Sequence, residues 1–180
     1  WHASPKHGKF KNDPALTTVQ KKLISDWVKA GAPLGDTNDL PTPPEFTKGW
    51  RIGKPDVVFQ VTKKPYSVPA TGVLPYEYFQ VKTNFKEDKW VQAAEIRIGN
   101  RAVVHHVVVI VSPRGVQPVH GEIGSEWLTA AAPGSKPLVL ADGLAKVIPA
   151  GATLVFQVHY TPIGTPQTDL STVGFKFVDK

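Results

Sequence analysis

The stretch Arg101-Ala-Val-Val-His-His-Val-Val-Val-Ile-Val111 decides the fold of this chain. β-Branched valine and isoleucine dominate it, and no charge follows Arg101, which predicts a strand over Ala102–Val111 that is covered on both faces. His105 and His106 lie in its middle. An imidazole ring in an apolar wall is costly unless its nitrogens have partners. This pair therefore requires a partner from elsewhere in the chain.

A second apolar segment, Thr153-Leu-Val-Phe-Gln-Val-His-Tyr160, predicts another strand and carries His159. If the two strands are neighbours, His105, His106 and His159 form a candidate metal site. Imidazole is the commonest side-chain ligand for copper and zinc, whereas calcium and magnesium prefer oxygen. The three histidines therefore indicate copper or zinc.

The alternation of side chains along a strand opposes such a site. His105 and His106 would point to opposite faces of a regular strand, so a bulge, a twist or a position at the strand end is needed to bring them together. On the second strand, His159 shares its face with Gln157 and Val155. The alternative is that one histidine of the pair lies in the core, the other on the surface, and His159 near a rim.

The remaining candidates lie outside the two histidine-bearing segments: His2, His7, His120, Glu95 and Glu122. His2 and His7 belong to a polar segment and are expected to face solvent, while His120 is a possible fourth ligand. A catalytic zinc site needs an open position and a nearby base, which Glu95 or Glu122 could supply. Asp169 is interpreted as a turn residue rather than an acid catalyst.

Length and composition bound the function. The 180 residues allow one full domain with an appendage. The absence of cysteine excludes disulfides, zinc-thiolate sites, c-type haem attachment and thiolate copper centres. The net charge of +6 comes without a nucleic-acid-binding motif, so no nucleic-acid partner is expected. No apolar run is long enough to span a membrane. Because methionine is also absent, we expect the chain to be part of a longer polypeptide.

The first 45 residues are expected to form one helix and a connector. Thr17 and Gln20 have the spacing of a capping box, and Gly31 with Pro33 gives stop signals. One face of this helix is apolar and carries Val19, Leu23, Ile24, Trp27 and Val28. Such a helix must pack on a neighbour, either the main domain or another domain. A Pro-rich connector follows from about residue 32 to 55, and we place the domain boundary between residues 1–45 and 46–180.

The rest of the chain has the pattern of an all-β domain. Short segments rich in β-branched and aromatic residues predict strands at Val57–Val61, Tyr76–Thr83, Trp90–Ile98, Ala102–Val111, Lys146–Ile148, Thr153–Tyr160 and Thr172–Val178. No crossover helices separate them, which predicts antiparallel sheets packed as a sandwich or barrel. The segment from Ser112 to Leu144 is rich in proline and glycine and is expected to be the main loop, around Trp127.

Three segments carry a resemblance to a known family: Val104-His105-His106-Val107, the stretch from Leu154 to Tyr160, and the stretch from Asp169 to Phe175. They are similar to the copper type II, ascorbate-dependent monooxygenases, the group of peptidylglycine alpha-hydroxylating monooxygenase and dopamine beta-monooxygenase. The resemblance covers roughly residues 50–180 and implies a jelly-roll β-sandwich.

In that family the matching histidines bind the electron-transfer copper, so the resemblance implies copper held by His105, His106 and His159. It also implies that ascorbate or another small reductant supplies the electron. A second, oxygen-activating copper domain, absent from this chain, would receive it. That domain uses two further histidines and a methionine, so this chain alone is not expected to hydroxylate a substrate. An extracytoplasmic location, periplasmic or secreted, is expected.

The lead-in resembles a different module. The stretch from Trp1 to Asp36, especially Lys29-Ala-Gly-Ala-Pro-Leu-Gly-Asp36, is similar to the closing helix of bacterial c-type cytochrome domains that precede such monooxygenases. The haem-binding Cys-x-x-Cys-His and the axial methionine are absent, so no haem is expected here. A c-type cytochrome domain is a possible partner.

Two other classes of function remain open from the sequence. The domain could be a metal-free jelly roll that binds a glycan or a protein through its loops, with Trp127 and Tyr160 as contacts. It could also be a mononuclear zinc or copper enzyme complete in itself. Metal stoichiometry separates the first of these from the copper module, and turnover by the isolated chain separates the second.

Overall fold

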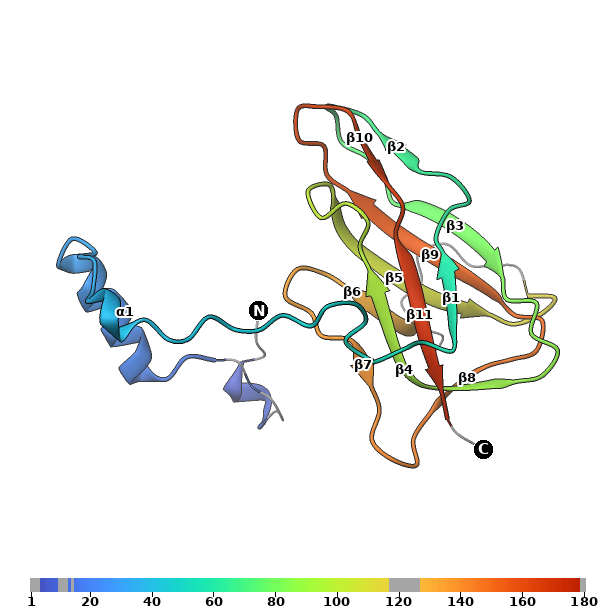
Figure 1. Ribbon diagram of the computed structural model, residues 1–180, viewed down its shortest axis with the longest axis horizontal. Helices are drawn as coiled ribbons and strands as arrows, with labels where there is room; N and C mark the ends of the chain where they lie inside the picture. The colour runs from blue at the N-terminus through green and yellow to red at the C-terminus, as the bar shows by residue number, and fades with distance from the viewer. Residues whose placement is uncertain (1–3, 10–12, 14, 117–126, 179–180) are drawn as a thin grey trace. The chain divides into compact units, whose positions relative to one another are not determined.

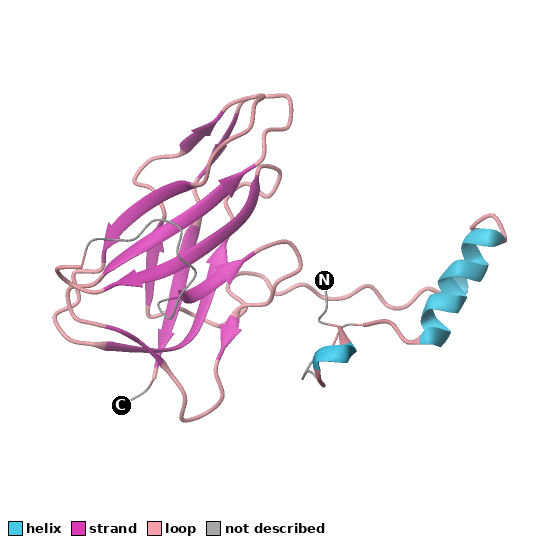
Figure 2. Ribbon diagram, turned by 180° about the vertical axis from the view of Figure 1, so that it is seen from behind, coloured by secondary structure: helices cyan, strands magenta, loops and turns pink. Residues whose placement is uncertain are grey.

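The computed structural model describes residues 4–9, 13, 15–116 and 127–178. The chain divides into two compact units, Trp1–Glu45 and Phe46–Lys180, and each is described by itself. In the described part of the chain, helices occur only in the first unit and strands only in the second (Figures 1 and 2). The candidate histidines His105, His106 and His159 therefore all belong to the β unit.

The first unit contains the predicted helix. Its elements are η1 (Pro5–His7), α1 (Thr18–Lys29) and η2 (Thr37–Asp39). The capping box is confirmed: the Gln20 backbone N–H donates to Thr17 Oγ1 at 3.2 Å, and the Thr17 backbone N–H donates to Gln20 Oε1 at 2.8 Å. These two bonds satisfy groups that the first helical turn leaves without partners, which fixes where α1 begins.

The apolar stripe of α1 is exposed within its unit. Its members are Val19, Leu23, Ile24, Trp27 and Val28, which are between 51 and 69% exposed. No residue of α1 is buried. Packing of this stripe on a neighbouring element therefore stays a prediction. Within the described residues, no helix combines the length and the apolar character that crossing a membrane requires.

The second unit is an all-β sandwich with two main sheets. One sheet has the order β1 (Val57–Gln60), β11 (Thr172–Phe177), β4 (Lys89–Arg97) and β7 (Leu138–Val139), and β8 (Lys146–Ile148) also pairs with β4. The other has the order β3 (Glu77–Lys82), β9 (Thr153–Tyr160), β5 (Val104–Ser112) and β6 (Trp127–Ala131). A short ribbon joins β2 (Tyr66–Val68) to β10 (Gln167–Asp169). All pairings are antiparallel, as expected, and Figure 1 shows the two sheets as facing layers.

Inward-facing residues of both sheets build one core between them. On β4 and β11 they are Val91, Ala94, Ile96, Val173 and Phe175; on β5 and β9 they are Val107, Val109, Val111, Leu154, Phe156, Val158 and Tyr160. Each fully buried large apolar side chain contributes about 1.5–3 kcal/mol, so this layer holds the two sheets together. The jelly-roll connectivity stays a prediction.

The outer face of β5 is covered as well. Val108 and Ile110 are buried there with Val155 of β9, and Tyr78 and Trp127 pack against them. The predicted strand with two covered faces is therefore confirmed over its central part. The two histidines lie at the N-terminal end of this strand, where the burial is less complete.

The expected main loop from Ser112 to Leu144 is partly wrong. It contains β6 and β7, which extend the sheets beside β5 and β4, while residues 117–126 lie outside the described part. The short strands β2 and β10 were not predicted either. These strands have two to five residues, and their formation depends on backbone hydrogen bonds to a neighbouring strand rather than on their own pattern. Elsewhere the predicted strands match the structure within about two residues.

Candidate metal centre

A β-bulge at the start of β5 places the two adjacent histidines. In the pairing of β5 with β9, Val104 lies opposite Tyr160 and His106 lies opposite His159. Two steps along β5 thus correspond to one step along β9, and His105 is the extra residue. A bulge of this kind interrupts the alternation of side chains. Of the arrangements that could bring the two histidines together, a bulge is the one that the structure contains.

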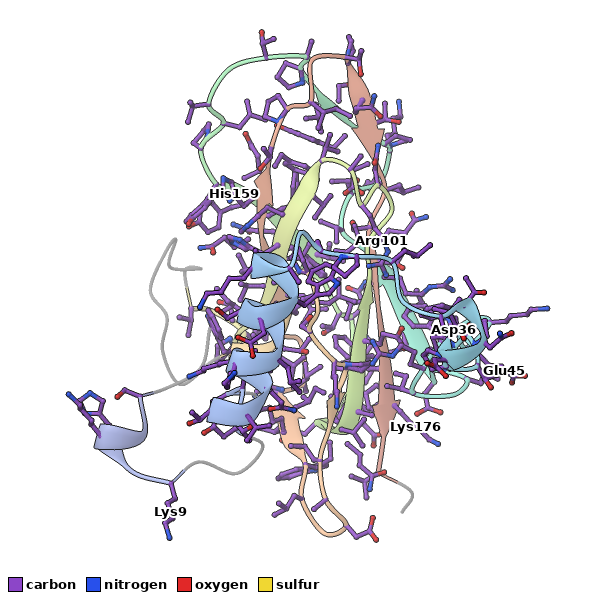
Figure 3. The ribbon with its side chains drawn as sticks, turned by 90° about the vertical axis from the view of Figure 1, so that its left-hand side faces the viewer. Lys9, Asp36, Glu45, Arg101, His159 and Lys176 are labelled. Atoms are coloured by element: carbon purple, nitrogen blue, oxygen red, sulfur yellow. The ribbon has the colours of Figure 1, made fainter. Side chains whose placement is uncertain are left out.

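The three imidazole rings converge on the outer face of their sheet. The ring centroids of His105, His106 and His159 are 5.2 to 5.4 Å apart. One potential ligand nitrogen from each ring lies within 4.8 Å of the others. Figure 3 shows the His159 ring projecting outward from its strand, away from the second sheet. The alternative in which the histidines are scattered is therefore wrong.

This spacing suits a single ion. Imidazole nitrogens bind zinc at about 2.0–2.1 Å, so two ligands of one such ion lie at most about 4.2 Å apart. His105 Nδ1 and His106 Nδ1 are 3.2 Å apart, well within this limit. The three nitrogens lie within 4.8 Å of one another, so binding of one ion by all three rings requires the third nitrogen to move inward. The three potential ligands are imidazole nitrogens, which bind a metal in their neutral form, and the cluster found among the described residues contains no carboxylate. This donor set favours copper or zinc.

The environment of His106 favours its unprotonated form, which is the form that binds metal. Burial lowers the pKa of His106 below its ordinary value, and the neighbouring His159 and His105 rings lower it further. A hydrogen bond with Gln157 raises the pKa and offsets part of this effect. Because a metal ligand must be unprotonated, a lowered pKa extends the pH range in which the site can bind an ion. His105 is exposed, whereas His106 and His159 are half-buried.

Gln157 connects the site to its supporting strand. Its side chain is 8% exposed, and its Nε2 donates to the Tyr78 hydroxyl at 2.8 Å. This leaves the amide oxygen available for His106. A ligating histidine commonly uses its second ring nitrogen to contact an amide, carbonyl or carboxylate oxygen that fixes the orientation of the ring. Gln157 occupies the position of such an orienting group.

Tyr76 forms a wall of the site that the sequence analysis did not identify. Its ring lies edge-on to His106 at 5.4 Å and to His159 at 5.1 Å between centroids. Tyr76 immediately precedes β3, whose residue Glu77 pairs with Val158. The sequence contains the tyrosine but not this register, so no local signal placed it beside His159.

A buried hydrogen-bond cluster fixes the loop that leads into the bulge. Asp169 accepts from the Asn100 backbone N–H at 2.9 Å, from the Tyr160 hydroxyl at 3.1 Å and from the Ser171 hydroxyl at 2.9 Å. Asp169 is 2% exposed and ends β10, so its interpretation as a turn residue is wrong. Gly99 fits closely here: a Cβ atom would lie 2.7 Å from the Leu170 backbone.

Of the other candidate residues, Glu95 and His7 lie in the described part of the chain, and neither joins the three-histidine cluster. Glu95 is buried, and its Oε2 accepts from the backbone N–H groups of Arg51 and Ile52, at 2.5 Å for Arg51. Its carboxylate thus anchors the connector to β4. His7 is exposed in the first unit. The candidates His2, His120 and Glu122 lie outside the described residues.

One contact proposed for a binding module is also misplaced. Tyr160 is 1% exposed and lies in the core, where it stacks on Tyr66 at 4.9 Å between centroids. Burial and the Asp169 carboxylate raise its pKa, so its hydroxyl remains a hydrogen-bond donor. Tyr160 therefore cannot contact a ligand at the surface. Trp127 lies in β6 and packs against the outer apolar cluster of Val108, Ile110 and Val155.

Comparisons of the chain with protein-family models, with curated proteins and with solved structures find no match. The proposed function therefore depends on the site itself and on the sequence motifs.

Proposed function

We propose that the second unit binds one copper ion through His105, His106 and His159 and serves as the electron-transfer half of a type II copper monooxygenase. The observation that carries this proposal is the bulge that turns two consecutive histidines toward a third on the neighbouring strand. A bulge interrupts the ladder and leaves a residue unpaired. Its position at an imidazole pair supports a ligand-binding purpose.

The donor set favours copper over a hydrolytic zinc centre. Divalent copper binds nitrogen ligands more tightly than zinc does. A hydrolytic site also needs a general base, and Glu95, the candidate base within the described residues, already accepts hydrogen bonds from two backbone groups. A bound copper ion would supply a centre that gains and loses one electron. Without thiolate ligands, such a centre would be of type 2.

The surrounding residues suit an electron-transfer role. Gln157 and Tyr76 hold the two half-buried rings, which limits their movement when the charge of the centre changes. The exposed His105 ring offers an edge through which an electron can enter or leave. Electrons would come from ascorbate, another small reductant or a c-type cytochrome domain. They would pass to a second copper domain outside this chain, in an extracytoplasmic compartment.

Copper titration of the purified chain, followed by paramagnetic resonance, tests the proposal. We expect one Cu(II) per chain with hyperfine structure from nitrogen ligands, and loss of that signal in His105→Ala and His159→Ala. His7→Ala is the matched control, because it removes an exposed histidine from the other unit. Addition of ascorbate should abolish the signal by reduction to Cu(I).

Two outcomes would contradict the proposal. Absence of stoichiometric metal would favour a metal-free binding module. Catalytic turnover by the isolated chain would instead favour a mononuclear metalloenzyme complete in itself.

A further inference from the structure

Two adjoining hollows lie at the end of the sandwich that is remote from the histidines. The segment after β3, the turn after β5 and the turn before β9 form them. Figure 1 shows the ends of β3 and β5 and the start of β9 on the same side of this unit. Ser112 pairs with Thr153 here, six residues along both strands from the pairing of His106 with His159. At about 3.3 Å per residue, the hollows are about 20 Å from the candidate metal centre.

Arg114 lies between the two hollows and lines both of them. The hollows have volumes of about 390 and 320 Å³ and share Arg114 and Gly151. A β-turn holds Arg114: the Val116 backbone N–H donates to the Pro113 carbonyl at 3.1 Å, and Gly115 has a φ of 80°, which glycine accepts. The stem of Arg114 rests on Gly151, where an added Cβ atom would lie 3.1 Å from Arg114 Cδ. Packing on the neighbouring turn thus positions the Arg114 side chain.

The lining of both hollows is basic. Lys82 lines the first hollow, Lys86 the second and Arg114 both, and the described residues that line them include no acidic one. In the part of the chain that the structure describes, these three side chains have no hydrogen-bond or ion-pair partner. Asp88 borders the second hollow, where its carboxylate accepts from the Ala150 backbone N–H at 2.8 Å. Three cationic groups around one depression favour an anionic ligand.

Neutral hydrogen-bonding side chains accompany the cations. Gln80 and Thr153 line the first hollow and Asn84 the second, and their side chains have no partner among the described residues. Amide and hydroxyl groups both donate and accept hydrogen bonds, which suits the hydroxyls of a sugar. The Gly151 backbone N–H, in contrast, already donates to the Phe85 carbonyl at 2.9 Å. The site therefore favours a ligand that side chains recognise over an extended peptide, which needs backbone partners.

We propose that the two hollows bind an oligosaccharide that carries carboxylate groups, with Arg114 between two of its sugar units. The planar guanidinium of Arg114 can bind one carboxylate through two parallel hydrogen bonds. Both volumes are near the lower limit of about 300–1,000 Å³ for small-molecule sites, which suits short, ring-sized units. This site is separate from the three histidines and does not depend on the proposed function.

Titration of tetragalacturonate into the ¹⁵N-labelled chain at low ionic strength, followed by NMR, tests the proposal. We expect one site per chain, with the largest amide shifts at Gly115 and Gly151. The affinity should fall about tenfold or more in Lys82→Gln/Arg114→Gln, which removes charge-assisted hydrogen bonds. It should also fall in Arg114→Lys, which keeps the charge but lacks the planar fork. The spectrum of each variant shows whether it is folded.

Two control proteins separate this site from general charge and from the metal centre. Lys64→Gln/Lys176→Gln removes two exposed lysines that line neither hollow and should bind tetragalacturonate normally. His105→Ala removes a proposed copper ligand and should also bind it normally. Hexaglutamate and sulfate serve as competing anions without sugar hydroxyls, and both should bind more weakly.

The assignment would be overturned by absence of tetragalacturonate binding or by amide shifts centred away from the two turns. Equal weakening in both double variants, or sulfate that binds as tightly as tetragalacturonate, would show a general charge effect and overturn it as well. Hexaglutamate that binds as tightly would show a site for acidic peptides instead. Copper binding enters none of these outcomes, so failure of this assignment leaves the proposed function intact.

Discussion

Replacement of Gln157 by leucine should weaken copper binding without unfolding the domain. Loss of a group that orients a ligating histidine typically costs 10–100-fold in metal affinity, or about 1.4–2.7 kcal/mol. The Gln157 amide to Tyr78 hydroxyl bond, 2.8 Å long, contributes about 0.5–1.5 kcal/mol to stability. A leucine at this position would lie opposite Val108 and next to the outer apolar cluster, where new burial offsets that loss.

Competition for Cu(II) against a chelator of known affinity measures the effect, and calorimetric unfolding measures stability. Gln80→Leu is the matched control, since Gln80 lies on β3 opposite Val155 and is exposed. We expect affinity to fall only in Gln157→Leu and the stability of the two variants to agree within about 1 kcal/mol. Unchanged copper affinity in a folded Gln157→Leu protein would refute the role of Gln157 in orienting His106.

Three further predictions concern the bulge, the loop and pH. Deletion of His105 should restore regular pairing of β5 with β9, so the protein should fold with near-normal stability by calorimetry but lose copper binding. The substitution His105→Ala should also abolish copper binding, but it should keep the bulge. Gly99→Ala should cost about 1–3 kcal/mol in denaturant unfolding, because its Cβ would meet the Leu170 backbone at 2.7 Å and the Asp169 carboxylate at 2.8 Å. The lowered pKa of His106 means that folding disfavours its protonated form; stability of the metal-free protein should therefore fall as pH drops below about 6.5, and His106→Asn should reduce this slope in unfolding titrations.

The strongly apolar strands could be predicted from the sequence because their pattern depends on burial. β8 and β9 begin and end at the predicted residues, and the alternation along β9 correctly assigns Gln157 and His159 to one face and Phe156 to the core. β-Branched and aromatic residues favour a pleated, buried surface wherever that surface is formed. The residue pattern of such a strand therefore predicts it without knowledge of its neighbours.

The short strands and the surroundings of the site could not be predicted, because they depend on register. β6 forms along the edge of β5, and nothing within Trp127–Ala131 specifies that partner. Tyr76 meets His159 only because β3 pairs with β9 in one particular alignment. The period of a strand showed that a bulge, a twist or a strand end was needed at the histidine pair. Which of these occurs depends on the pairing of β5 with β9, and that pairing places the bulge at His105.

Anomalous diffraction from crystals of the protein grown with one equivalent of Cu(II) tests the central claim most directly. We predict a single copper peak per chain, within bonding distance of nitrogens from His105, His106 and His159. The claim would be contradicted by a copper ion bound elsewhere, for example at His7. It would also be contradicted by a fully occupied copper ion that lacks a bond to any one of these three rings.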